Sequence, residues 1–135
     1  CAVLLSPWAD LSCAAPSMTE RAERDPLLSQ EGLANSAAAY LGTQDSGHPL
    51  ASPVNGHFEG IAPLHIHVGS EEILHDDAVR LAERVRETGG SAEIKVWEGM
   101  IHDWSLFWFA GLEEATALIA EAGDSMTRSL ATPTD

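Results

Sequence analysis

Carboxylates and an imidazole follow two successive apolar runs in the second half of the chain. Four acidic residues come after the first of these runs: Glu71, Glu72, Asp76 and Asp77. His102 comes after the second run. A carboxylate that orients an imidazole, and an imidazole that takes a proton from a hydroxyl, make up two thirds of a hydrolytic triad. No G-x-S-x-G occurs in the 135 residues, so the sequence predicts that a nucleophile would lie on another segment.

Three short apolar runs predict the strands that position these residues. They are Ala2–Leu5, residues 64–68, in which Leu, Ile and Val alternate with His, and Ala92–Trp97. The continuous apolar character of the first run predicts a central strand that is buried on both faces. Side chains that follow the carboxyl ends of neighbouring parallel strands lie at the same edge of the sheet. We therefore expect an acidic side chain and His102 to lie close together.

A helix is predicted between the second and third strands. Its apolar positions fall at i, i+3, i+4 and i+7: Ala78, Leu81, Ala82 and Val85. Asp76 and Asp77 are suited to capping its start, and Gly89-Gly90 ends it. A strand, a helix and a strand in this order form the crossover of a parallel βαβ unit. A final amphipathic helix is predicted from Leu112, Ala115, Leu118, Ile119, Ala122 and Met126.

The segment 11–60 differs in composition from the rest of the chain. It is rich in Ser, Ala, Asp and Gly and contains four prolines: Pro16, Pro26, Pro49 and Pro53. One helix is predicted inside it, with Ser29 as its N-cap and Gly42 as its end. Because so long a connection in a compact domain is usually a lid or a binding segment, we expect it to be a cap-like insertion. Residues 1–130 are then one partial domain, and residues 131–135 are a polar tail.

The run HVGSEEILHDDAVRLAERVRETGGSAEIKVWEGMIHDWSLF resembles the carboxyl-terminal part of the hormone-sensitive-lipase-like esterase branch of the α/β-hydrolase superfamily. Three upstream blocks resemble earlier parts of that family's fold: VLLSPWADLS, DPLLSQEGLANSAAAYLG and HPLASPVNGHFEGIAPLHIHVGS. The resemblance extends from about Ala2 to Ala122. It implies three parallel strands with crossover helices and a partly helical cap.

The resemblance also implies roles for two residues. The family's acid-x-Leu element matches Glu72-Ile73-Leu74, and its Gly-Met-x-His element matches Gly99-Met100-Ile101-His102. Glu72 would be the triad acid and His102 the general base. Since the family usually has Asp at the acid position, Asp76 and Asp77 remain alternatives. The oxyanion motif HGG and the nucleophile elbow are expected upstream, and without them this chain alone is expected to be inactive. No cofactor is implied.

Composition narrows the partners that the chain could bind. Twenty-one acidic and seven basic residues give a formal charge of −14, which repels nucleic acid and anionic bilayers. Cys1 and Cys13 are expected to be reduced thiols in a cytoplasmic protein. His65, His67 and His75 could together form a metal site. Ordinary hydrogen bonding of these side chains is the favoured interpretation. The expected substrate is a small or medium acyl ester.

Two further alternatives follow from the sequence. The aromatic residues after His102 fit either core packing or the wall of an ester pocket: Trp104, Phe107, Trp108 and Phe109. A catalytically silent hydrolase-like fragment, acting as an interaction or regulatory module, is the alternative to an enzyme. A sheet edge that lacks its neighbouring strand would invite strand addition or assembly into a homo-oligomer.

Overall fold

A sheet of three parallel strands organises the chain. The computed structural model describes residues 1–131, and the strands are β1 (Ala2–Leu5), β2 (Leu64–Gly69) and β3 (Ala92–Trp97). The strand order is β1-β2-β3, and both pairings are parallel. The predicted α/β class with three parallel strands is therefore confirmed.

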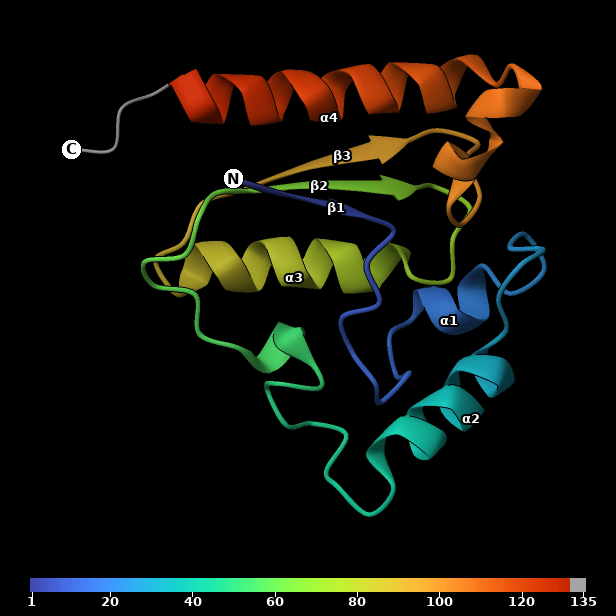
Figure 1. Ribbon diagram of the computed structural model, residues 1–135. Helices are drawn as coiled ribbons and strands as arrows, with labels where there is room; N and C mark the ends of the chain where they lie inside the picture. Colours follow the sequence, from blue (N-terminus) through green and yellow to red (C-terminus); the bar gives the residue numbers. More distant parts are fainter. Residues whose placement is uncertain (132–135) are drawn as a thin grey trace.

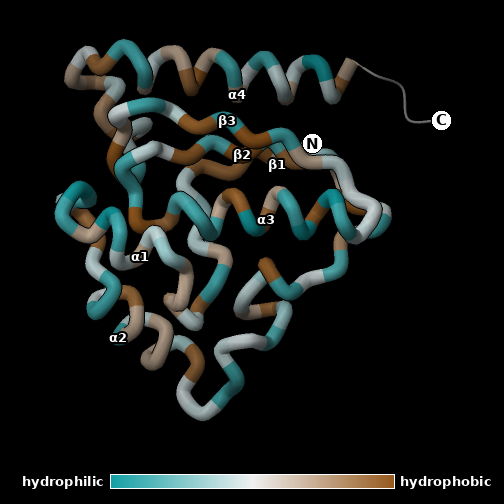
Figure 2. The backbone as a smooth tube through the Cα atoms, turned by 180° about the vertical axis from the view of Figure 1, so that it is seen from behind, coloured by the Kyte–Doolittle hydropathy of each residue, from teal (hydrophilic) through white to brown (hydrophobic). Residues whose placement is uncertain are grey.

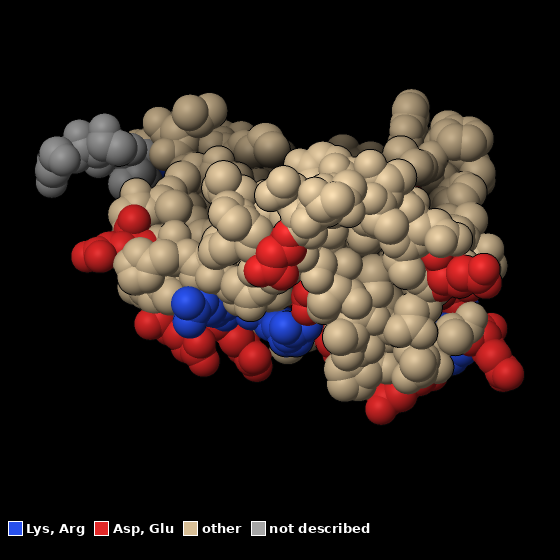
Figure 3. Space-filling view, turned by 90° about the horizontal axis from the view of Figure 1, so that it is seen from below, with Lys and Arg blue, Asp and Glu red and all other residues tan. Residues whose placement is uncertain are grey.

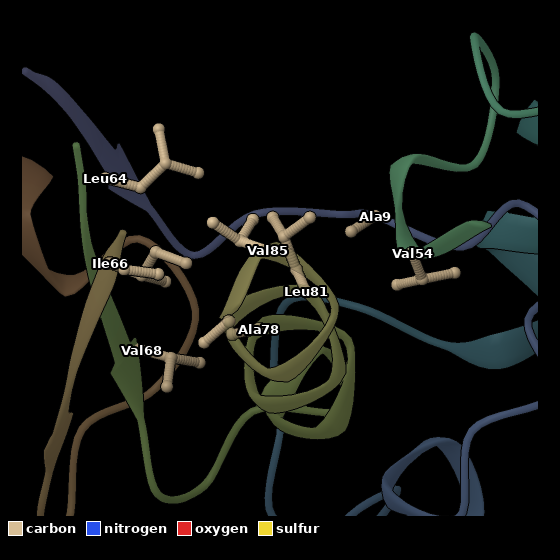
Figure 4. Packing of buried hydrophobic residues seen from close by; sticks show 10 residues of the cluster. Ala9, Val54, Leu64, Ile66, Val68, Ala78, Leu81 and Val85 are labelled. Carbon is tan, nitrogen blue, oxygen red and sulfur yellow. The ribbon is translucent and has the colours of Figure 1, made fainter. Parts of the chain in front are cut away.

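One helix covers each face of this sheet (Figure 1). The helix α3 (His75–Glu87) connects β2 to β3, as predicted, and α4 (Glu113–Ala131) packs on the opposite face. The alternation within β2 divides its side chains between the two faces. Its apolar residues point at α3 in Figure 4, where the buried contacts join Leu64, Ile66 and Val68 to Ala78, Leu81 and Val85. A fully buried Leu, Ile or Val side chain contributes about 1.5–3 kcal/mol to the stability of the fold.

The opposite face of β2 carries histidines, which lie on the side of α4. His67 is buried and accepts a hydrogen bond from the indole nitrogen of Trp97 at 3.1 Å. A separate apolar cluster closes this face where β3 ends: Trp97, Trp104, Ala115 and Leu118. Trp104 opens the 3₁₀ segment η2 (Trp104–Ala110), so the chain that follows His102 is anchored between the sheet and α4.

Three short elements occupy the segment 11–60, which contains no strand. They are α1 (Ser17–Glu20), α2 (Gln30–Leu41) and η1 (Pro53–Asn55). The helix α2 has its predicted boundaries, because the Ser29 hydroxyl accepts from the Gly32 N–H at 3.1 Å and Gly42 ends the helix at a φ of 59°. The four-residue helix α1 was not predicted, since one turn shows no periodicity. In Figure 1, α1 and α2 lie on the same side of the sheet as α3.

Three sequence-based expectations need correction. Among the described residues β1 is an edge strand of the three-stranded sheet rather than a central one, and Leu5 at its end is 39% exposed. Asp76 and Asp77 do not cap α3, because its N-cap is Leu74 and both carboxylates lie inside the first turn, where they bind other segments. Ala131 is the last residue of α4 and not part of a tail, and the rest of the expected polar tail, residues 132–135, lies outside the described residues.

Hydropathy and charge follow this layered arrangement. In Figure 2 hydrophobic and hydrophilic positions alternate along β2 and β3, and they also alternate along α3 and α4. On the face shown in Figure 3, the Lys and Arg side chains lie beside Asp and Glu and form no separate basic patch. Within residues 1–131, no helix has the length and apolar character needed to cross a bilayer.

Candidate active site

The acidic side chain of Glu72 lies in the turn between β2 and α3 and is fully buried. Its Oε1 accepts two hydrogen bonds, from the Gly69 N–H at 2.6 Å and from the Ser6 hydroxyl at 2.7 Å. A buried carboxylate is costly unless donors surround it, and here both donors come from strand ends. These contacts leave Oε2 facing the loop that follows β3.

His102 lies in that loop, and its Nδ1 is 3.1 Å from Glu72 Oε2. Since a carboxylate only accepts hydrogen bonds, Nδ1 carries the proton in this contact and Nε2 faces outward. The two loops are held together by their backbones: the Ser70 N–H donates to the Trp97 carbonyl at 2.9 Å, and the Glu71 N–H donates to the Met100 carbonyl at 3.0 Å. The arrangement gives an imidazole that is oriented by a buried carboxylate at the carboxyl rim of a parallel sheet.

A second carboxylate lies at the outward nitrogen of this imidazole. Asp103 Oδ2 is 3.4 Å from His102 Nε2, and the Asp103 side chain is 40% exposed. Burial of the imidazole disfavours its charged form. The hydrogen bond with Glu72 and the negative charges of Asp103, Glu72 and Asp25 outweigh that effect, so the pKa of His102 is raised above its ordinary value.

The segment that contains α1 holds the acid-bearing turn in place. The Ile73 N–H donates to Asp25 Oδ2 at 3.0 Å, and the Ile73 carbonyl accepts from the Ser17 hydroxyl at 2.6 Å. Arg21 donates to the Ser70 carbonyl. Apolar packing accompanies these bonds, because Met18 and Leu33 share a buried cluster with Ile73. This part of the expected cap therefore supports the turn that carries Glu72.

Asp76 and Asp77 do not contact His102. Asp76 accepts from the Ser17 N–H at 3.0 Å and pairs with His75 at 2.9 Å. Asp77 Oδ2 accepts from the N–H groups of Ala9 and Asp10, both at 2.9 Å. Burial raises the pKa of Asp77 to about 6, although the two backbone hydrogen bonds oppose the shift. Both carboxylates thus serve contacts between segments near the start of α3.

The three histidines considered as metal ligands do not converge. His65 Nδ1 is 3.1 Å from Glu93, His67 bonds to Trp97, and His75 bonds to Asp76. Among residues 1–131, no group of three or more His, Cys, Asp or Glu side chains has a geometry that could hold a metal ion. Cys1 and Cys13 are both free thiols.

Exposed aromatic and aliphatic side chains follow His102 along η2. Trp104 is buried, whereas the later large apolar side chains are exposed to different degrees: Leu106 63%, Phe107 37%, Trp108 59% and Phe109 73%. Core packing therefore applies to the first of these residues, and the wall of an ester pocket remains a prediction for the later ones. Trp104 belongs to the core, and the other four residues present apolar side chains to the surface.

Comparison with known proteins identifies the family to which this arrangement belongs. A family model described as the α/β-hydrolase fold matches residues 1–106. The chain belongs to the α/β-hydrolase family. Its solved relatives agree: an esterase from the bacterial hormone-sensitive lipase family superposes on this α/β hydrolase with a TM-score of 0.90 and 37% identity, over 94% of this chain and 42% of that one. The chain is thus a member of the hormone-sensitive-lipase-like branch.

Curated relatives of this α/β hydrolase are named as an acetyl-hydrolase and an esterase. An acetyl-hydrolase of Streptomyces hygroscopicus is 43% identical over 90% of the chain, and an esterase of Acinetobacter venetianus is 34% identical over 92% of it. The protein EstE5, in a crystal soaked with p-nitrophenyl butyrate, superposes with a TM-score of 0.92 and 37% identity over 97% of the chain and 44% of EstE5. The chain spans about two fifths of the length of the curated relatives, 40% and 42% respectively.

Sequence reasoning missed four residues that shape this site. Ser6 and Gly69 were not predicted as site residues, because neither belongs to a catalytic motif in the sequence. Asp25 was not considered, because its partner Ile73 is 48 positions away in the chain. Asp103 directly follows His102, and that adjacency was the signal that could have identified it.

Proposed function

We propose that this chain supplies the acid and the base of a Ser-acid-His triad in a carboxylic ester hydrolase. Glu72 is the proposed acid and His102 the proposed base. The observation that carries the proposal is the 3.1 Å contact between Glu72 Oε2 and His102 Nδ1, in a chain of the α/β-hydrolase family. Small or medium acyl esters are the proposed substrates, which agrees with the p-nitrophenyl butyrate used with EstE5.

The reaction follows from the orientation of the imidazole. A serine hydroxyl attacks the ester carbonyl while His102 Nε2 takes the hydroxyl proton, which forms a tetrahedral intermediate. Collapse of this intermediate breaks the ester C–O bond, and Nε2 returns the proton to the departing alcohol. Water then repeats the two steps on the acyl-serine and releases the acid. Glu72 keeps the proton on Nδ1 and stabilises the imidazolium in each step.

The serine and the oxyanion donors are proposed to lie on a segment outside these 135 residues. Two facts support this part of the proposal: no G-x-S-x-G occurs in the chain, and the chain spans about two fifths of its relatives. The chain alone is then expected to hydrolyse no ester. The exposed side chains of η2 are proposed to line the acyl or alcohol pocket, because apolar walls suit an ester substrate.

The proposal is tested in a protein that carries this chain together with the nucleophile segment. Hydrolysis of p-nitrophenyl butyrate is measured for wild type, His102→Gln and His75→Gln. His75 is a matched control, because its side chain is 16% exposed against 17% for His102 and it also contacts a carboxylate, at 2.9 Å. We expect His102→Gln to lower kcat by about 10³-fold or more, and His75→Gln to lower it less than tenfold.

The alternative of a catalytically silent module makes the opposite prediction. A folded wild-type protein that contains both segments and shows no hydrolysis above the His102→Gln background would reject the enzyme and favour the module. The feature that favours such a module is the outer edge of β1, which pairs with no strand among the described residues and would offer its backbone donors and acceptors to a partner strand.

A further inference from the structure

Ser6 has an unusual backbone conformation at the end of β1. Its φ is 45°, in the left-handed region that favours glycine, and its side chain lies in the buried interior. The hydrogen bonding between β1 and β2 continues at this residue, because the Ser6 N–H donates to the His67 carbonyl at 2.8 Å. A non-glycine residue persists in this conformation only when its surroundings favour it.

The Ser6 hydroxyl connects the two loops of the acid and the base. It donates to Glu72 Oε1 at 2.7 Å and accepts from the Asp103 N–H at 3.3 Å. Asp103 is the residue after His102, and its own φ of 50° is also left-handed. One hydroxyl therefore holds the proposed acid and the backbone next to the proposed base.

We propose that Ser6 is a positioning residue for the pair formed by Glu72 and His102. The inference rests on the proposed function of that pair and deepens it. With Gly69, the Ser6 hydroxyl fixes the carboxylate plane, so that Oε1 is occupied and Oε2 faces the imidazole. Through Asp103, it fixes the distance between the imidazole loop and the carboxylate.

The length of the acidic side chain explains why a second donor is needed. Glutamate has one more rotatable bond than aspartate, so its carboxylate has more freedom to turn away from the imidazole. The Gly69 N–H contacts only Oε1 and comes from the same turn as Glu72, three residues away. The Ser6 hydroxyl comes from a different strand, 66 positions away, and ties the turn to β1.

The test measures His102 directly by NMR titration of its imidazole nitrogens in the 135-residue chain. Three carboxylates face this ring and are left intact: Glu72 from the turn after β2, Asp103 from its own loop, and Asp25 from the segment after α1. Ser6→Ala removes the hydroxyl. Ser6→Gly also removes it but suits the left-handed backbone, so that variant separates the role of the hydroxyl from any backbone strain.

Ser52→Ala is the matched control. Ser52 is also buried, and its hydroxyl also donates one hydrogen bond, to the Ser46 carbonyl, and accepts one, from the Leu11 N–H. A purely structural loss would appear equally in Ser6→Ala and Ser52→Ala as a lower melting temperature. Only a positioning role changes the His102 signals in the Ser6 variants alone.

We expect both Ser6 variants to lower the pKa of His102 towards its ordinary value and to weaken the Nδ1–H hydrogen-bond signal, while Ser52→Ala changes neither. In a protein that carries the nucleophile segment, both Ser6 variants should lower kcat about tenfold to a hundredfold with little change in KM. An unchanged or higher pKa of His102 in folded Ser6→Gly would overturn the inference. Because the titration needs no activity, the change in the pKa of His102 can be interpreted even if the esterase proposal fails.

Discussion

Gly69 and Met100 are in such close contact that no side chain fits between them. A Cβ at Gly69 would collide with the Met100 carbonyl and would lie 3.0 Å from Glu72 Oε1. The last residue of β2 thus touches the loop of His102 through backbone alone. The absence of a side chain is what allows the acid turn and the base loop to meet.

Gly69→Ala is expected to destabilise the protein by about 1–3 kcal/mol and to separate Glu72 from His102, because the Cβ must push the Met100 backbone away. Urea unfolding measures the first effect, and NMR titration of His102 measures the second. Gly123→Ala is the control: a Cβ there has no heavy atom within 4 Å, and alanine in α4 should stabilise the protein by up to about 1 kcal/mol. Equal stability of the two variants would contradict the proposed contact.

Asp103→Asn is expected to lower the pKa of His102, because it removes a negative charge 3.4 Å from Nε2. A lower pKa leaves more of the imidazole unprotonated in weakly acidic solution. The acid limb of the kcat/KM profile should therefore move to lower pH in a protein that carries the nucleophile segment. Glu98→Gln removes an exposed charge from the same loop and serves as the control. Identical acid limbs for Asp103→Asn and wild type would show that Asp103 does not act on the imidazole.

Asp77 predicts a pH dependence of stability. Its pKa is about 6 in the folded chain, above the 3.8 of an unperturbed aspartate. Between these values, rising pH ionises Asp77 in the unfolded chain while the folded chain keeps the proton, so the free energy of unfolding falls. Relative to Asp77→Asn, wild type should lose about 3 kcal/mol between pH 3.5 and pH 6.5. Denaturant titrations at several pH values measure this difference, and parallel curves for the two proteins would refute it.

The strands and the long helices could be predicted because their signals are local. The alternation in residues 64–68 and the i, i+3, i+4 spacing in α3 depend on near neighbours in the sequence. Asp76 and Asp77 were misassigned as caps because acidic residues at a helix start usually bind that helix. Here they bind the backbones of Ser17, Ala9 and Asp10, which are more than 55 positions away.

The residues of the candidate site also differ in whether a local sequence signal identifies them. Glu72 and His102 could be named because each follows a strand and matches a family element, and the structure has them 3.1 Å apart. Ser6 and Asp25 could not be found, since Ser6 bonds to Glu72 and Asp103, and Asp25 to Ile73, which are all distant in the sequence. Neither Ser6 nor Asp25 belongs to a motif. β1 was expected to be central because its apolar run has the composition of a buried strand, and composition does not reveal which strands are present beside it.

The most direct test of the whole account compares Glu72→Gln with Glu71→Gln and Asp76→Asn in the hydrolysis of p-nitrophenyl butyrate, in a protein that carries the nucleophile segment. Glu71 is the adjacent carboxylate and pairs with Arg24 at 3.2 Å, and Asp76 is a rival acid from the same region. We predict that Glu72→Gln lowers kcat by about 10³- to 10⁴-fold, and that the other two variants stay within about tenfold of wild type. A folded Glu72→Gln protein with wild-type kcat, or a larger loss in Asp76→Asn, would contradict the account.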